Sequence, residues 1–346
     1  MEETTMKKLI ALFLTAALLA CLAGCAGTTV VVGNCTCPPD AHEPVEAPSA
    51  APEGMLKTGL AILPSISKSA SATAEANGKA EYDVTVVAVT VDEKGIIQNC
   101  VIDSIGISSE FTAEGIPAVP GTSPVKTKQE KGFDYGMVAS GSKYEWFEQA
   151  AALAEFAVGK TAEEVKGGYS DDVDLATSAS IYLGGYVAGI EAAVANAGFL
   201  GAGAGQELEL AVNASLEAGD GKAQLNVDAV ALTLSGDVIT SCAIDSLQAA
   251  VEFDGTGTVI TDVNAAPKTK MQLGFDYGMV SYNASAIGLE WFQQVENFCN
   301  YVTGKTAAQI SGIAVNQDGK TTDVDLAAQC SIAIDDFQTL IAKAFQ

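Results

Sequence analysis

The sequence repeats itself, and this internal repeat limits the possible folds more than any other feature. The heptapeptide GFDYGMV at residues 132–138 recurs at 274–280, and the pentapeptide DVDLA at 172–176 recurs at 323–327. Other matched segments lie between and before them in the same order. Such self-similarity indicates one unit that is present twice. We therefore expect two tandem copies of one domain, at residues 75–200 and 206–346, joined by the Gly/Ala segment between them.

Within each copy, strand patterns precede helix patterns. Alternating and β-branched residues around short Asp/Gly turns predict four strands, at residues 82–91, 96–105, 223–234 and 238–247. Apolar residues at helical spacing follow Trp146 and Trp291, and a last helix is expected at 181–197 and 332–345. Strands followed by helices predict the α+β class, with an antiparallel hairpin or sheet followed by helices in each copy.

The N-terminus has the features of an export signal. Lys7 and Lys8 precede an apolar run, which ends in Leu-Ala-Gly before Cys25. A positive segment, an apolar core and small residues before a cleavage site are typical of such signals. The tetrapeptide Leu-Ala-Gly-Cys, which ends at Cys25, resembles a lipobox. We therefore expect residues 1–24 to be removed and Cys25 to carry a lipid. An uncleaved membrane anchor is the alternative. The Pro/Ala/Glu-rich composition that follows predicts a spacer over residues 25–74.

Charge and composition exclude several classes of function. The formal net charge is −25, so the chain repels nucleic acid. All 18 basic residues are lysines, and His42 is the one histidine. Catalysis by a Ser-His-Asp or Cys-His group therefore lacks its base, and a histidine-rich metal site lacks its ligands. We predict no catalytic residue and no metal site.

The end of each copy carries the motif with the most specific chemistry. Residues 174–180 read DLATSAS, and residues 325–331 read DLAAQCS. Together with the opening hairpin, these segments resemble the FMN-binding domain family, in which FMN is joined through its phosphate to a hydroxyl at the end of an Asp-x-x-Ser-Gly-Ala-Thr motif. The resemblance implies covalent FMN on Ser180 and Ser331. The sequence departs from the family pattern at Ser178 and Gln329, where the family has glycine.

The resemblance also implies roles for residues around the two serines. The motif residues Asp174, Thr177 and Asp325 are the other implied FMN contacts, and Tyr135 and Tyr277, each between a glycine and an acid, are expected to be exposed enough to stack on the flavin ring. Two alternatives stay open: the Asp and Thr side chains would equally cap the N-terminus of the last helix, and the aromatic residues would equally belong to the core.

Two further sets of matched residues have alternative interpretations. Lys126 and Lys128, matched by Lys268 and Lys270, would either bind an anion or form a solvated edge. Cys100 and Cys242 lie in expected strands, which favours small buried residues rather than bridges.

These features together predict a lipid-anchored protein on the extracytoplasmic face of the cell membrane. The first hypothesis is an electron-transfer carrier with up to two covalent FMN groups, loaded by a flavin transferase and reduced by a membrane redox donor. The alternative is a non-redox binding or structural lipoprotein that keeps the fold without flavin. Neither hypothesis requires substrate turnover by the protein's own residues.

Overall fold

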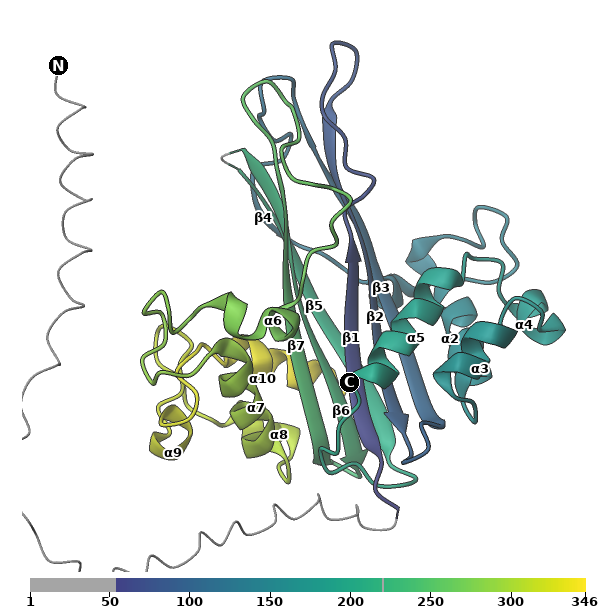
Figure 1. Cartoon of the computed structure of the whole chain (residues 1–346), viewed down its shortest axis with the longest axis vertical. Coiled ribbons are helices and arrows are strands. Elements are labelled where there is room, and N and C mark those ends of the chain that lie inside the picture. The colour runs from purple at the N-terminus through teal and green to yellow at the C-terminus, as the bar shows by residue number, and fades with distance from the viewer. Residues whose placement is uncertain (1–53, 220) are drawn as a thin grey trace, which may run out of the picture. The chain divides into compact units, whose positions relative to one another are not determined.

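The computed structural model describes residues 54–219 and 221–346, which belong to one compact unit (Figure 1). The predicted signal peptide, Cys25, His42 and most of the predicted spacer lie outside the described residues. The described chain combines helices with two antiparallel sheets, so the predicted α+β class is confirmed. We call residues 54–200 the N-terminal half and residues 206–346 the C-terminal half.

Each half contributes three long antiparallel strands. One sheet has the order β1-β2-β3, and the other has the order β4-β5-β6-β7. The short strand β4 comes from the N-terminal half but pairs with β5, so it joins the sheet of the C-terminal half. The strands are β1 (Lys57–Ser65), β2 (Gly78–Val91), β3 (Ile97–Phe111), β4 (Gly121–Pro124), β5 (Glu207–Gly219), β6 (Lys222–Ser235) and β7 (Val238–Glu252).

The two predicted hairpins are confirmed as β2–β3 and β6–β7. At the first turn, Asp92 Oδ1 accepts hydrogen bonds from the N–H groups of Lys94 and Ile96, and Gly95 has φ +79°. This is the local chemistry that made Asp and Gly a turn signal in the sequence. The strands run further than the pattern predicted, because their outer ends are buried between the sheets.

The sequence pattern did not predict β1 or β5, which are the first long strand of each half. Strand β1 lies within residues 25–74, which were predicted to be a spacer, so that boundary is wrong. Strand β1 pairs along its whole length with β2, and β5 does the same with β6. In β1 the buried residues follow one another without interruption, which removes the alternation that identifies a strand with one solvated face.

The helices of each half follow its strands. Those of the N-terminal half are α1 (Lys128–Lys131), η1 (Gly132–Tyr135), α2 (Trp146–Ala157), α3 (Ala162–Gly168), α4 (Val173–Ser178) and α5 (Gly184–Ala195). Those of the C-terminal half are α6 (Lys270–Leu273), η2 (Gly274–Tyr277), α7 (Trp291–Val302), α8 (Ala307–Ser311), α9 (Val324–Ala327) and α10 (Asp335–Lys343). Among the described residues, no helix is both long enough and apolar enough to cross a membrane.

The two Trp helices and the two last helices confirm four predicted elements. Glu145 and Glu290 cap α2 and α7, and each carboxylate also accepts two backbone N–H groups of the preceding loop, at 2.7–3.0 Å. These buried glutamates therefore hold the loop that follows the GFDYG segment against the helix. The last helices, α5 and α10, are shorter than predicted.

The interpretation that the acidic motif caps the last helix is wrong. Asp172 and Asp323 accept hydrogen bonds at the N-termini of two separate short helices, α4 and α9, and no side chain caps α5 or α10. The apolar pattern did not reveal the turn between the short helix and the last helix.

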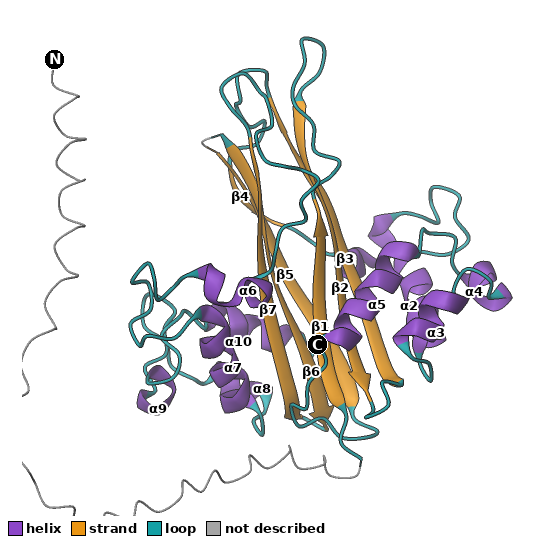
Figure 2. Cartoon of the chain, viewed as in Figure 1, coloured by secondary structure: helices purple, strands orange, loops and turns teal. Residues whose placement is uncertain are grey.

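The sheets pack against each other, and the helices cover their outer faces. One apolar cluster joins both sheets and includes Ile62, Tyr82 and Phe111 from one sheet and Leu225 and Val251 from the other. Two further clusters lie between each sheet and its own helices. In Figure 2 the strands lie together, with one group of helices on each side. Each half therefore depends on the other for one face of its sheet.

Candidate functional site

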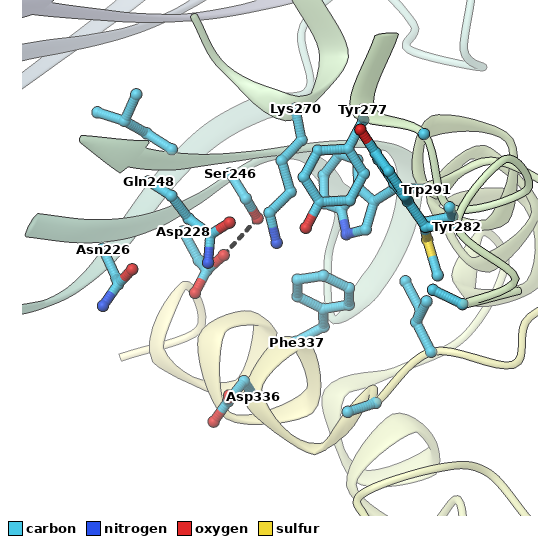
Figure 3. A pocket seen from close by; sticks show the side chains of 16 residues that line it. Asn226, Asp228, Ser246, Gln248, Lys270, Tyr277, Tyr282, Trp291, Asp336 and Phe337 are labelled. Atoms are coloured by element: carbon cyan, nitrogen blue, oxygen red, sulfur yellow. Dashed lines mark hydrogen bonds between the residues drawn. The ribbon is translucent and has the colours of Figure 1, made fainter. Parts of the chain in front are cut away.

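A cavity lies in the C-terminal half, between β6–β7, the loop after η2, and helices α7 and α10. It has a volume of about 610 Å³, which is within the usual range for small-molecule sites. Figure 3 shows that Lys270 and the rings of Tyr277, Trp291 and Phe337 face one another across this space. The site therefore combines apolar walls with a small number of polar groups.

Aromatic rings and one lysine form one end of the cavity. Lys270 Nζ lies 5.3 Å from the ring centroid of Tyr277 and 5.2 Å from that of Trp291. The ring centroids of Trp291 and Phe337 are 6.4 Å apart in an edge-to-face arrangement. The aromatic faces stabilise the ammonium group and fix its position, while it remains available to an anion or a hydrogen-bond acceptor.

Two carboxylates also line the cavity. Asp228 on β6 accepts a hydrogen bond from the Ser246 hydroxyl, and Asp336 lies at the start of α10 (Figure 3). Burial raises the pKa of Asp228, and the nearby Asp336 charge raises it further, while Ser246 and Lys270 oppose this shift. Neither carboxylate forms an ion pair within 4.0 Å with a described residue. The cavity is therefore lined by one ammonium group and two carboxylates.

The corresponding place in the N-terminal half is filled by a tyrosine. Tyr186 packs on Trp146 as Phe337 packs on Trp291. Its hydroxyl accepts a hydrogen bond from Trp146 Nε1 at 2.9 Å and another from Lys128 Nζ at 3.3 Å. Phe337 has no hydroxyl, so Trp291 and Lys270 lack these bonds. The same two donors are therefore satisfied internally in one half and face a cavity in the other.

Differences in side-chain size explain why α5 lies closer to its sheet than α10. A Cβ on Gly59 would lie 2.0 Å from the Ala193 carbonyl oxygen, and one on Gly189 would lie 2.7 Å from Val87 Cγ2. Glu209 and Leu340 stand at the corresponding places in the C-terminal half. Two glycines let α5 approach the sheet, while larger side chains hold α10 away from it.

The two predicted FMN-attachment serines make the same contacts in both halves. Ser180 Oγ lies 3.2 Å from Gln149 Oε1, and Ser331 Oγ lies 3.0 Å from Gln294 Oε1. Both glutamines are buried and also accept the backbone N–H of the serine. Ser331 directly precedes Ile332 and Ala333, which line the cavity.

The other predicted site residues are not brought together into one site. Asp174, Thr177 and Asp325 lie exposed on α4 and α9, and the Thr177 hydroxyl donates to the Asp174 carbonyl. Tyr277 lines the cavity, whereas Tyr135 lies over Lys128 and Lys131 in the N-terminal half.

The cavity residues that the sequence pattern did not identify include Asp228, Tyr282, Asp336 and Phe337. The available signal was the difference between the copies rather than their similarity. Asp228 pairs with Ser246 where Thr85 pairs with Ser104, and Asp336-Phe337 stands where the N-terminal half has Gly185-Tyr186. A motif present in both halves identifies the structure that they share. Residues that function in one half only are not part of such a motif.

No protein family model, curated protein or solved structure matches this chain.

Proposed function

We propose that this chain is a lipid-anchored extracytoplasmic binding protein whose C-terminal half holds one small aromatic ligand. The cavity lined by aromatic rings, one lysine and two carboxylates is the observation that carries this proposal. Its rings offer stacking surfaces to a flat molecule. Lys270 and Trp291 Nε1 would bind an anionic or hydrogen-bond-accepting group, and Asp228 and Asp336 would bind donors. The lipid on Cys25 would keep the protein on the outer face of the membrane.

The two halves are best understood as copies of one domain that have diverged. Matched residues make matched contacts: the glutamate caps of α2 and α7, the serine–glutamine pairs, and the lysines over the Trp rings. The N-terminal copy would then have a structural role, since Tyr186 satisfies its donors.

A second candidate function is electron transfer by FMN bound in the same cavity. FMN has a flat ring, an anionic phosphate and several hydrogen-bond donors, which fits the groups that line the site. Ser331 would hold FMN through a phosphoester bond, and its position just before Ile332 and Ala333 favours it over Ser180. When bound, FMN would supply the redox chemistry.

The protein's own residues would position this group rather than react with it. Tyr277 and Trp291 would contact the ring, and Gln294 would hold the Ser331 segment in place. A flavin transferase would load the protein, and a membrane redox donor would reduce it.

A binding titration tests the first proposal. The full chain is titrated with FMN and, separately, with riboflavin, and flavin fluorescence is followed. We expect saturable binding at one site, and about a tenfold loss of FMN affinity in Lys270→Met, because a charge-assisted contact is removed. Lys128→Met is the matched control and should leave binding unchanged. Equal losses in both variants, or no binding of either flavin, would count against this site.

Intact-mass spectrometry tests the second candidate. The full chain is exported from cells that also produce a flavin transferase, with a known flavinylated protein as a loading control. We expect one added FMN less one water, located on the peptide that contains Ser331 and absent in Ser331→Ala. If the mass of the chain is unmodified while the control protein carries FMN, covalent attachment of FMN to this chain is excluded. Non-covalent binding is then tested by the titration alone.

A further inference from the structure

Two cysteines of the C-terminal half lie in contact. Cys242 on β7 and Cys299 on α7 have their sulfur atoms 3.3 Å apart, and both residues are buried. A disulfide requires about 2.05 Å, so both thiols are free in this structure. The pair is absent from the sequence-based expectations, because Cys299 lies in a helix and has no cysteine partner in the other copy.

The pair borders a second cavity of about 490 Å³, which is lined by both halves. Thr58, Leu60 and Asn196 of the N-terminal half face the two cysteines across it. This cavity gives a small reagent a route to both sulfur atoms. Burial raises the pKa of the Cys242 thiol, which lowers the thiolate fraction and slows reaction in the folded state.

The N-terminal half contains only one thiol at the matched place. Cys100 stands where the other half has Cys242, and Ala154 stands where it has Cys299. Both Cys100 and Ala154 line a smaller cavity of about 310 Å³, so the two places correspond in space as well as in sequence. Only the C-terminal half has two sulfur atoms positioned to react with each other.

We propose that Cys242 and Cys299 form a disulfide that fastens helix α7 to strand β7 in the oxidising space outside the membrane. The oxidant is a disulfide, either that of a thiol oxidase or that of a low-mass thiol. One cysteine thiolate attacks the oxidant disulfide and releases one thiolate. The second cysteine thiolate then attacks the mixed disulfide and releases the other. The two cysteine protons pass to the two released thiolates, and the oxidant is reduced to two thiols.

The sequence allows this bond to be located by digestion. Cleavage after lysine places Cys100, Cys242, Cys299 and Cys330 in four different peptides, residues 95–126, 223–268, 271–305 and 321–343. The folded full chain is treated with oxidised glutathione, alkylated, digested and analysed without reductant. We expect a linked pair of peptides 223–268 and 271–305, which is lost on reduction and in Cys299→Ala. Because the oxidation is done in vitro, the result does not depend on export or on ligand binding.

Two control variants sharpen this test. Cys330→Ala should retain the bond, although Cys330 is the other buried thiol of this core. Ala154→Cys supplies the missing partner of Cys100 and should add a second linked pair in the N-terminal half. Alkylation of Cys242 and Cys299 after oxidant treatment, or a link between Cys299 and Cys330, would overturn the proposal.

Thermal unfolding gives an independent readout of the same bond. A disulfide between Cys242 and Cys299 closes a loop of the chain and so restricts the conformations of the unfolded state. We expect the oxidised wild type to melt several degrees higher than the reduced wild type, and Cys242→Ala to melt at one temperature under both conditions. Equal melting temperatures for oxidised and reduced wild type would contradict a fastening role.

Discussion

The two halves share their supporting contacts and differ at the place where a ligand would bind. Each has a buried glutamate that caps the Trp helix, a serine held by a buried glutamine, and a lysine over the Trp ring. In the N-terminal half a tyrosine hydroxyl then completes the hydrogen bonds of that lysine and tryptophan. In the C-terminal half a phenylalanine leaves both donors facing a cavity. Each half therefore serves as an internal control for a functional role assigned to the other.

The contact between helix α5 and strand β1 at Gly59 gives the largest expected difference between the two halves. A Cβ at Gly59 would lie 2.0 Å from the Ala193 carbonyl oxygen, so Gly59→Ala forces α5 away from β1. We expect the free energy of unfolding to fall by about 3 kcal/mol, the upper end of the usual cost of overpacking. Denaturant titration measures it. Glu209→Ala, at the matched place in β5, should change stability by much less, and equal effects would refute the difference in helix approach.

A pair of matched buried aspartates predicts that stability depends on pH. Burial raises the pKa of Asp103 and Asp245 to about 6, from 3.8. Between these values the folded chain binds more protons than the unfolded chain, so the free energy of unfolding decreases as pH rises through this window. We expect a decrease on the order of 2 kcal/mol between about pH 5 and about pH 7, measured by denaturant titration.

The control for this pH dependence removes both titrating groups. In the double variant Asp103→Asn and Asp245→Asn, each side chain keeps an oxygen that accepts the backbone N–H of the next residue and a backbone N–H of the short helix α1 or α6. The decrease between the two pH values should then become much smaller. An unchanged decrease would assign the effect to the other acidic groups of this strongly negative chain.

Exchanging the aromatic residue on the last helix gives the smallest expected effect and the most specific one. Phe337→Tyr places a hydroxyl beside Lys270 and Trp291 Nε1, as Tyr186 does in the other half. We expect FMN affinity to fall by about tenfold, or about 1.4 kcal/mol, with little change in stability. The reverse exchange, Tyr186→Phe, should lower stability by about 1 kcal/mol through the lost hydrogen bonds and should create no binding site. Gain of FMN binding by that variant would show that the glycines do not close the N-terminal half.

The sequence predicted the hairpins and the Trp helices, because interactions between neighbouring residues determine these elements. The hairpins were visible because alternating residues surround an Asp-Gly turn, and the Trp helices were visible because buried residues recur at helical spacing. Strands β1 and β5 were missed because their partners, rather than their own pattern, make them strands. The capping interpretation failed for a related reason: Asp172 caps a short helix that ends before the last helix begins.

The candidate site was predicted only in part. Tyr277 was included because it belongs to a repeated motif, and Lys270 was recognised as a positive charge present in both copies. Asp228, Asp336 and Phe337 were not, since they occur in one copy only. Ser331 was selected from a resemblance, and its position next to the cavity wall became visible only after folding.

The sequence alone determined the repeated order of strands and helices, the acidic charge, the lack of arginine and the features of an export signal. Tertiary structure decided that the two sheets share one core, that α5 closes the N-terminal half, and that Cys242 meets Cys299. The physical reason is the distance along the chain over which each kind of interaction acts. Turns, caps and periodicity depend on neighbouring residues, whereas a cavity or a thiol pair depends on the distance between segments that lie far apart in the chain.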